Sequence, residues 1–239
     1  MARAGLCSRR EAERWIEQGR VRVNGAVLDT PAVTVSASDD IEVDGQLLPA
    51  LEAMRLFLYH KPAGLVTTHK DEQGRKTVFD ALPETLPRLI SVGRLDLNTE
   101  GLLLLTNDGG LARYLELPST GWSRRYRVRV LGDVNDMRLK DLKKGITVEG
   151  VRYKSIEAQL EQPKGGKKDG ANKWLSVSLR EGKNREIRRV MEALGLKVNR
   201  LIRTGYGPFE LSSLSRGSMQ EVEKKVLGAQ LQGYLKDQS

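Results

Sequence analysis

The chain has 239 residues, and 40 Lys and Arg against 31 Asp and Glu give it a formal net charge of +9. This length is typical of one or two domains with a sizeable core. The basic balance favours a polyanionic partner such as nucleic acid, although many basic proteins bind none. A single cysteine, Cys7, excludes an intrachain disulfide and a cysteine-based metal cluster.

The remaining composition argues against a metal and against a membrane. The two histidines, His60 and His69, do not have zinc-ligand spacing. Neither a secretory signal nor a long apolar span is found in the sequence. We therefore expect a cytoplasmic protein with no metal site.

The N-terminal residues predict a small unit that starts with a helix. Ser8 and Glu11 have the spacing of a capping box. Apolar residues at helical spacing follow, and Gly19 is expected to end the helix.

Two hairpins are predicted after this helix. Residues 20–28 alternate in polarity around Asn24-Gly25, the strongest short hairpin signal, and residues 41–43 precede a second signal at Asp44-Gly45. Residues 46–54 fit a linker that allows the two domains it joins to reorient.

Basic residues gather on this first unit. They are Arg9, Arg10, Arg14, Arg20 and Arg22. A phosphate-reading face needs such a local cluster. An ordinary salt-bridged helix is the alternative, because three glutamates share the segment.

The second unit begins with a predicted strand, residues 55–61, that ends at Pro62. Lys61 lies at this strand-to-turn corner; an architectural role is the first interpretation and a phosphate contact the second. Residues 67–77 form a polar loop, which sequence alone would call solvated, near a short helix at residues 78–82.

The rest of the chain is organised around residues 93–109, GRLDLNTEGLLLLTNDG. A polar, turn-rich start containing Asp96 leads into the apolar run 102–105, which turn residues then stop. Such a run predicts a buried strand. A carboxylate on the loop before it is positioned by the core and open to a ligand, although an exposed acid paired with Arg94 is the simpler interpretation.

Several elements are expected downstream of this stretch. Residues 110–117 predict a helix, and residues 122–130 a strand with Tyr126, Val128 and Val130 on one face and arginines on the other. Residues 132–150 suggest a small helix and a turn. Residues 164–173 suggest a flexible basic hairpin loop and residues 174–179 a strand.

A second charged motif, EGKNREIRRVM, occupies residues 181–191. Asn184 is expected to cap a helix with an apolar face. Cations crowd this helix start, where the macrodipole favours anions, so we expect an external anion or a buried acid nearby. A strand at residues 196–203, a turn at 205–208 and a C-terminal helix complete the prediction.

Four of these segments resemble known families. Residues 93–109 are similar to the active-site motif of the bacterial pseudouridine synthases that modify single ribosomal uridines. That branch comprises types B, E and F, which act on large-subunit RNA, and type A, which acts on small-subunit RNA; the resemblance is nearest to type B. Residues 1–25 resemble the RNA-binding module named after ribosomal protein S4, although one or two helical turns that precede this segment in the family are not in the chain. Lys61-Pro62-Ala-Gly64 and the arginine-rich segment 181–191 also match.

The resemblance implies roles for individual residues. Asp96 takes the position of the catalytic aspartate, Tyr126 that of a tyrosine lying against the target base, and Arg188 that of an arginine meeting the aspartate. Such a pairing typically lowers a carboxyl pKa by about 1–3 units, so Asp96 is expected to stay ionised. Residues implied to bind substrate or RNA are Arg94, Lys61, Arg9, Arg10, Arg14, Arg22, Arg124, Lys183 and Arg185.

The implied reaction converts uridine to pseudouridine without a cofactor, on a nucleotide flipped out of structured ribosomal RNA. The 23S (large-subunit) RNA is the expected partner, and a monomer the expected state. Alternatives are a 16S (small-subunit) RNA enzyme, a non-catalytic ribosome-assembly factor, or a glycosidase with two carboxylates, for which Glu100 is the second candidate and Asp108 a weaker one.

The expected fold class is α+β. An S4-like α/β module over residues 1–48 should precede a catalytic domain over residues 55–235, built on a mainly antiparallel mixed sheet flanked by helices.

Overall fold

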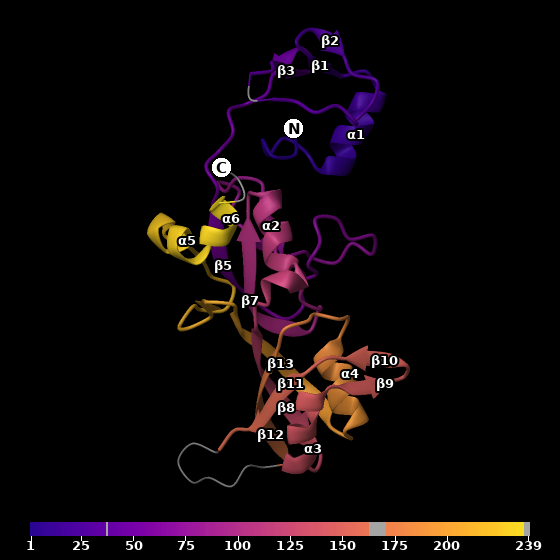
Figure 1. Ribbon diagram of the computed structural model, residues 1–239, viewed down its shortest axis with the longest axis vertical. Helices are drawn as coiled ribbons and strands as arrows, with labels where there is room; N and C mark the ends of the chain where they lie inside the picture. Colours follow the sequence, from indigo (N-terminus) through magenta and orange to yellow (C-terminus); the bar gives the residue numbers. More distant parts are fainter. Residues whose placement is uncertain (37, 163–170, 237–239) are drawn as a thin grey trace.

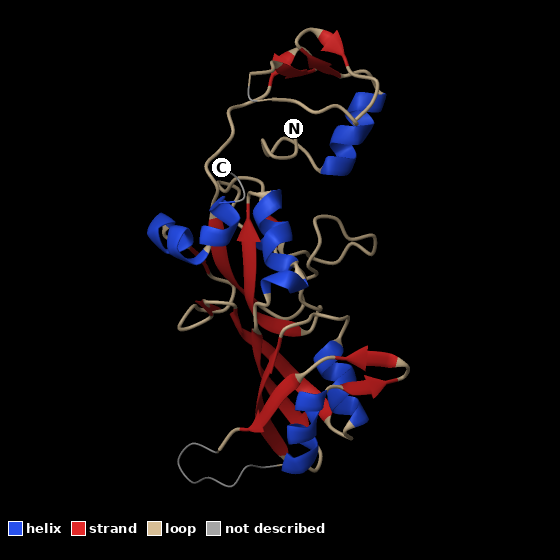
Figure 2. Ribbon diagram, in the orientation of Figure 1, coloured by secondary structure: helices blue, strands red, loops and turns tan. Residues whose placement is uncertain are grey.

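A computed structural model of the chain describes residues 1–36, 38–162 and 171–236. A small sheet with one helix forms the N-terminal end, and a large mixed sheet flanked by helices forms the rest (Figures 1 and 2). This arrangement confirms the α+β expectation. Within the described residues, no helix has the length and apolar character needed to cross a membrane.

Helix α1 (Arg9–Glu17) begins at the predicted capping box. The Ser8 hydroxyl accepts from the Glu11 amide at 3.2 Å, and the Glu11 carboxylate accepts from the Ser8 amide at 3.0 Å. Ile16 packs on Val21 and Val43 in a small core. Residues 2–5, before this helix, form turns.

Both predicted hairpins are present in the small antiparallel sheet, whose order is β2-β1-β3-β4. Its strands are β1 (Val21–Val23), β2 (Ala26–Val27), β3 (Ile41–Val43) and β4 (Gln46–Leu47). Asn24 and Asp44 adopt positive φ at 51°, each followed by a glycine that does the same, as tight two-residue hairpin turns require. Because β4 pairs with β3, the linker is shorter than expected.

The large sheet has the main order β11-β12-β8-β13-β7-β5-β15, with β14 beside β13 and β6 beside β7. Its strands are β5 (Leu56–Lys61), β6 (Ile90–Ser91), β7 (Thr99–Thr106), β8 (Arg124–Leu131), β11 (Ile156–Leu160), β12 (Asn172–Leu179), β13 (Lys197–Tyr206), β14 (Phe209–Glu210) and β15 (Met219–Glu221). Every residue of β7 is buried, so the predicted central strand is confirmed. Only β7 and β13 pair in parallel among the described strands.

Helices cover this sheet. They are α2 (Gly109–Glu116), α3 (Asp136–Asp141), α4 (Glu186–Ala193), α5 (Lys224–Gln230) and α6 (Gln232–Lys236), with 3-10 turns at Phe79–Ala81, Pro118–Thr120 and Leu142–Lys144. One core joins α2 and the C-terminal helices to β7, and another joins α4 to β8 and β12. These two cores hold β7, β8 and β13 rigidly side by side, which is where the candidate site lies.

Some elements differ from expectation. A separate hairpin of β9 (Ile146–Val148) and β10 (Val151–Tyr153) stands where a turn was expected at the end of residues 132–150. The β13 strand continues through Tyr206 into the predicted turn at residues 205–208. Residues 164–170 of the predicted basic loop lie outside the described residues.

Candidate active site

Asp96 lies on the loop immediately before β7, and a buried cation shapes that loop. Lys61, with no exposed surface, donates from Nζ to the carbonyl oxygens of Pro62, Asp96, Leu97 and Thr99 at 3.0–3.3 Å. Burial lowers the pKa of Lys61 to about 8, while nearby carboxylates act in the opposite direction. These contacts favour the architectural interpretation of Lys61 over the phosphate contact, because its side chain has no exposed surface in this structure.

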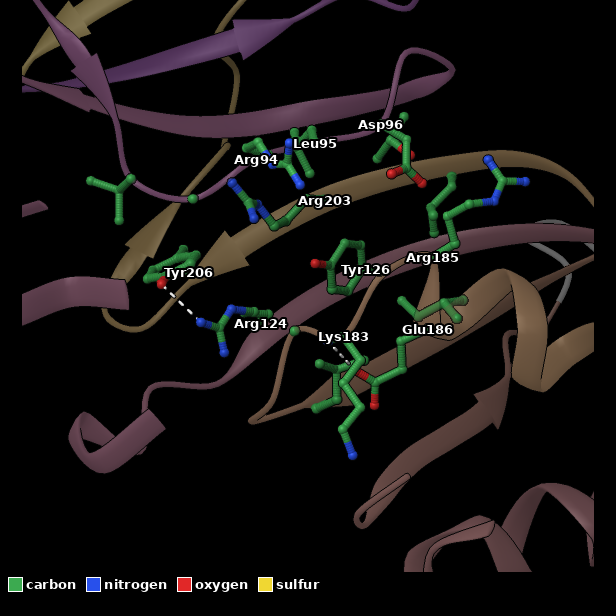
Figure 3. A pocket seen from close by; sticks show the side chains of 17 residues that line it. Arg94, Leu95, Asp96, Arg124, Tyr126, Lys183, Arg185, Glu186, Arg203 and Tyr206 are labelled. Carbon is green, nitrogen blue, oxygen red and sulfur yellow. Dashed lines mark hydrogen bonds between the residues drawn. The ribbon is translucent and has the colours of Figure 1, made fainter. Parts of the chain in front are cut away.

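A cavity of about 140 Å³ lies beside Asp96. Asp96, Tyr126, Ile187 and Arg203 are among its lining residues, and Figure 3 shows their strands and loops converging on it. It adjoins a wider groove of about 670 Å³ that also reaches Arg94 and Arg185. A small hollow opening into a wide basic groove suits a flat group held inside and a larger anionic molecule outside.

Tyr126 reaches this cavity from β8. The predicted alternation is confirmed, because Val128 and Val130 are buried whereas Arg127 and Arg129 are exposed. Tyr126 itself is half-buried, with its ring toward the cavity (Figure 3). Its position follows from the two-residue period of the strand.

Arg188 does not form the expected ion pair with Asp96. Instead, its guanidinium donates to the carbonyl oxygens of Asn98 at 3.2 Å and Val198 at 3.3 Å. Burial lowers the pKa of Arg188, the charge of Arg185 adds to this effect, and the Asp96 carboxylate opposes it. Arg188 therefore lies close enough to sense the acid but holds the backbone of its loop.

The start of α4 also differs from expectation. Asn184 does not cap the helix; Arg185 occupies the N-cap position with φ of 49° and makes no side-chain cap. The Glu186 carboxylate instead accepts from the amide of Lys183 at 2.9 Å. The prediction that Asn184 caps this helix is therefore wrong, because the side chain of Glu186 makes the hydrogen bond in this turn.

Glu186 is the buried acid near the cationic helix start. Burial raises its pKa to about 7, and the neighbouring Glu181 carboxylate pushes it in the same direction. Its Oε1 has no hydrogen-bond donor among the described residues.

The other basic residues predicted near the site divide into two groups. Arg94 and Arg185 are exposed and line the groove. Arg124 is tied down by contacts to the carbonyl of Arg180 and the hydroxyl of Tyr206. The Lys183 ammonium is turned away from Asp96, toward Glu181 and the carbonyl of Arg152 (Figure 3).

In the N-terminal unit, the four arginines expected to bind RNA are exposed: Arg9, Arg10, Arg14 and Arg22. Arg20 differs from them, because its guanidinium pairs with Asp44 and lies over the ring of Trp15.

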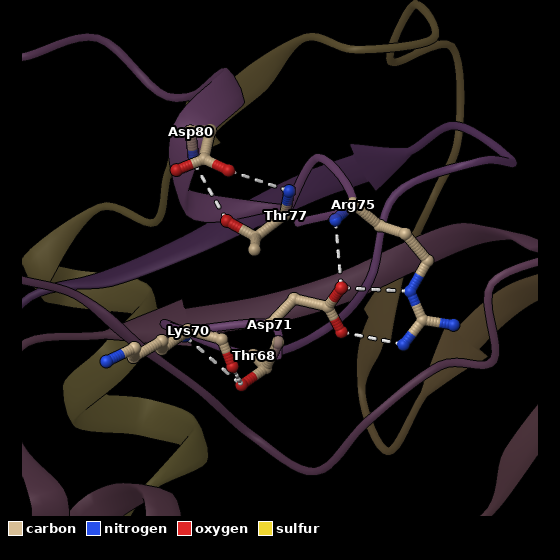
Figure 4. Close-up of polar contacts among 6 residues, drawn as sticks. All are labelled: Thr68, Lys70, Asp71, Arg75, Thr77 and Asp80. Atoms are coloured by element: carbon tan, nitrogen blue, oxygen red, sulfur yellow. Dashed lines mark hydrogen bonds and ion pairs between the residues drawn. The ribbon is translucent and has the colours of Figure 1, made fainter. Parts of the chain in front are cut away.

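The polar loop of residues 67–77 is held by internal contacts (Figure 4). Arg75 donates to both carboxylate oxygens of Asp71, at 3.0 and 2.6 Å, and this pairing lowers the pKa of Asp71 to about 2. Asp80 accepts from the Thr77 amide, and His69 stacks on Phe79 with ring centroids 3.6 Å apart.

Comparison with known proteins decides what this site belongs to. The family model described as RNA pseudouridylate synthase matches residues 55–193, and the S4 domain model matches residues 1–41. The chain belongs to the RNA pseudouridine synthase family. It is therefore an enzyme, an isomerase of uridine in RNA, with an S4 domain at its N-terminus.

Relatives of this synthase match it over nearly its whole length. An RNA pseudouridine synthase of Rickettsia felis is 48% identical over 95% of this chain and 96% of its own. Ribosomal large subunit pseudouridine synthase B of Yersinia pestis is 44% identical over 95% of this chain and 72% of its own. A crystal structure of a pseudouridylate synthase superposes with a TM-score of 0.66 at 29% identity, covering 96% of this chain and 95% of that one.

The two acids considered for a glycosidase do not line the cavity of the synthase. Glu100 is 7% exposed and pairs with Arg200 at 2.7 Å and Arg216 at 3.0 Å. Asp108 caps α2 and accepts from the hydroxyl of Tyr234. Neither acid is therefore free to act as a second catalytic carboxylate there.

Three cavity residues with charged or aromatic side chains were missed from the sequence: Arg203, Tyr206 and Glu186. Arg203 could have been found from strand alternation. It is two residues after Leu201, so the two side chains share the buried face of the strand, where a charged residue is unusual. Tyr206 carries no such signal, because its place depends on β13 running three residues beyond the predicted strand end at residue 203.

Proposed function

We propose that this synthase isomerises a uridine of large-subunit (23S) ribosomal RNA, with Asp96 as the catalytic residue. The choice of RNA rests on the 44% identity to enzymes named ribosomal large subunit pseudouridine synthase B from Yersinia pestis and Escherichia coli O157:H7. The choice of acid rests on position: Asp96 and Glu186 are the two carboxylates that line the small cavity with Tyr126, and the Glu186 carboxylate accepts from the Lys183 amide.

In this proposal the target nucleotide leaves its stack and its base enters the cavity. Tyr126 packs against the uracil ring, and Asp96 acts on the nucleotide beside it. Arg188 positions the acid through the backbone of Asn98. Arg94 and Arg185, exposed along the groove, meet phosphates that stay outside.

Recognition of the surrounding RNA falls to the N-terminal unit. We assign residues 1–48 to an RNA-binding domain and residues 55–235 to the catalytic domain, acting as a monomer. Support comes from the four exposed arginines on α1 and β1, a phosphate-reading pattern that needs no base contacts. A ribosomal RNA substrate would place the enzyme in the cytoplasm.

Replacing Asp96 with Asn tests the catalytic assignment, because the amide keeps the size of the carboxylate and removes its charge. We expect release of tritium from carbon-5-labelled RNA to stop while RNA binding persists. Asp133→Asn, on the loop before α3, is the matched control. Near-normal release by Asp96→Asn would reject the role of this residue.

The RNA assignment needs a separate experiment. Unmodified large- and small-subunit ribosomal RNAs are incubated with the protein, and pseudouridines are mapped chemically. The same map is made on both RNAs from a strain lacking the gene. A new site in the large-subunit RNA that is missing from the deletion strain is expected; a site in the small-subunit RNA instead would contradict the proposal.

A further inference from the structure

Arg203 is a buried cation with an unused hydrogen-bond donor. Its side chain lies on β13 with 3% of its surface exposed, yet it lines the cavity beside Asp96. Nε donates to the carbonyl oxygen of Leu102 at 2.7 Å, and the guanidinium lies over the ring of Tyr206. Nη2 has no hydrogen-bond partner, and no carboxylate of the described residues lies within 4.0 Å of the side chain.

A buried arginine without a full set of partners lowers the stability of the folded protein. Moving a cation out of water costs several kcal/mol unless an opposite charge and hydrogen bonds compensate it. A buried donor left unpaired adds to this cost. The contact that Arg203 makes to β7 uses only Nε, and this leaves Nη2 without a partner on a side chain that lines the cavity. We take this unsatisfied guanidinium as the sign of a ligand.

Sheet register places Arg203 beside Tyr126. The two residues are direct partners on the antiparallel strands β13 and β8, so their side chains lie on the same face. On the other side, β13 runs so close to β7 that a Cβ on Gly101 would lie 2.2 Å from the carbonyl oxygen of Arg203. This close approach fixes the backbone from which the guanidinium extends.

We propose that Arg203 donates a hydrogen bond to a carbonyl oxygen of the target uracil and stabilises the negative charge that the base acquires during the reaction. The inference rests on the proposed function, in which the base lies against Tyr126. A group next to Tyr126 on the same face meets the edge of that base, and the edge carries carbonyl oxygens at carbons 2 and 4.

The chemistry of the reaction gives such a group a role. When the bond between C1′ of the sugar and N1 of the base breaks, its electron pair leaves with the base and spreads onto N1 and both carbonyl oxygens. When C5 bonds to C1′, an electron pair from the base forms the new bond, and C5 then loses its proton while N1 gains one. A guanidinium beside the base stabilises its negatively charged stage more than it stabilises the neutral uridine.

The depth of Arg203 argues for the base over a phosphate. Arg94 and Arg185 are exposed at the groove, whereas Arg203 is the most buried of the guanidinium groups that line the cavity. A phosphate diester remains part of the RNA backbone and is strongly hydrated, so it suits the exposed pair. The flipped base is the part of the nucleotide that reaches the cavity floor.

The first experiment separates chemistry from binding. Arg203→Lys keeps the charge but loses the planar set of donors. We expect its single-turnover rate constant to fall by about 10²–10³-fold, with little change in RNA affinity. Arg127→Lys is the control, because Arg127 lies on the exposed face of β8 and pairs with Glu161. A loss confined to RNA affinity, with an altered salt dependence, would mean a phosphate contact and overturn the proposal.

The second experiment identifies the contacted atom. Target uridine is replaced by 2-thiouridine or 4-thiouridine, because sulfur is the weaker hydrogen-bond acceptor. One of these substitutions should lower the single-turnover rate constant of the wild-type enzyme. The same substitution should lower the rate constant of Arg203→Lys by a smaller factor. Equal factors in both proteins at both positions would reject the contact.

If Arg203→Lys fails to fold, the rates of the wild-type enzyme on the two thio-substituted RNAs still test the proposal. If neither thio substitution slows the wild type, Arg203 contacts no carbonyl oxygen. Either outcome is distinct from failure of the proposed function, since tritium release by the wild type on unmodified ribosomal RNA is measured independently of Arg203.

Discussion

Arg188 donates a hydrogen bond of 3.2 Å to the carbonyl oxygen of Asn98, two residues beyond Asp96. Its other amino group donates to Val198 at the start of β13. The arginine thereby ties the loop carrying the acid to the strand that crosses beneath the cavity. Arg188 thus acts on the position of Asp96 through the backbone, and the Asp96 carboxylate has no ion-pair partner among the described residues.

This geometry predicts the effect of Arg188→Lys. A lysine has one nitrogen and cannot bridge both carbonyl groups, so the loop of Asp96 should lose its fixed position. A misplacement of about 1 Å costs about 10²-fold in rate, and we expect a loss of that size in single-turnover rate with RNA affinity unchanged. The adjacent Arg189→Lys is the control. Equal activity of the two variants would contradict the positioning role.

Lys61→Met should mainly destabilise the protein. Methionine fills the space but leaves four carbonyl oxygens without their donor: those of Asp96, Leu97 and Thr99 along the Asp96 loop, and that of Pro62. We expect the free energy of unfolding to fall by about 3 kcal/mol or more, measured by urea denaturation. Lys76→Met, at an exposed position of the polar loop, should change it little. Similar stability of both variants would show that the buried ammonium is dispensable.

Glu186→Gln should have a pH-dependent effect on stability. Burial raises the pKa of Glu186 from 4.5 to about 7 in the folded protein, so the native state holds a proton that the unfolded chain releases. The contribution of this group to stability is fully present below pH 4.5 and is lost as pH rises through 7. Glutamine stays neutral and avoids that loss.

The expected gain for Glu186→Gln is therefore about 1–3 kcal/mol at about pH 8 and close to zero at about pH 4.5. Thermal unfolding of wild type and variant at the two pH values measures it. An identical difference at both values would show that Glu186 does not titrate with folding.

Glu100→Gln should weaken the fold and spare the chemistry. The Arg200 guanidinium holds the pKa of Glu100 below its usual range, and Glu100 also pairs with Arg216. Because Arg200 is partly exposed, we expect a loss of about 1–3 kcal/mol in free energy of unfolding. Tritium release well below the unfolding temperature should persist. Its abolition in a folded variant would make Glu100 a second catalytic acid.

The arginines of the N-terminal unit should act on affinity alone. Replacing Arg9, Arg10, Arg14 and Arg22 with Gln removes exposed cations without disturbing the small core. If each contacts a phosphate, the slope of log affinity against log salt concentration should fall by about 0.7–0.9 per residue. Lys144→Gln, a surface residue of the catalytic domain, is the control. An unchanged slope would exclude this face from the RNA interface.

Much of the architecture could be predicted because its signals are local. The capping box at Ser8, the hairpin turns at Asn24 and Asp44, and the buried run of β7 each depend on residues within a few positions of one another. Tyr126 was placed correctly by the period of its strand. In contrast, Asn184 is a residue type that often caps helices, but here the Glu186 carboxylate accepts the backbone hydrogen bond at the start of the helix.

Taken alone, the amino-acid sequence specified which chemical groups this synthase has, and where strands and helices carry them, because strand period and capping act over short distances. The folded chain was needed to show that Lys61 is buried under the Asp96 loop, that Arg188 binds a backbone carbonyl, and that Arg203 stands beside Tyr126. These relationships depend on register and burial between strands far apart in the chain, and no local pattern encodes the direction in which a long cationic side chain finally points.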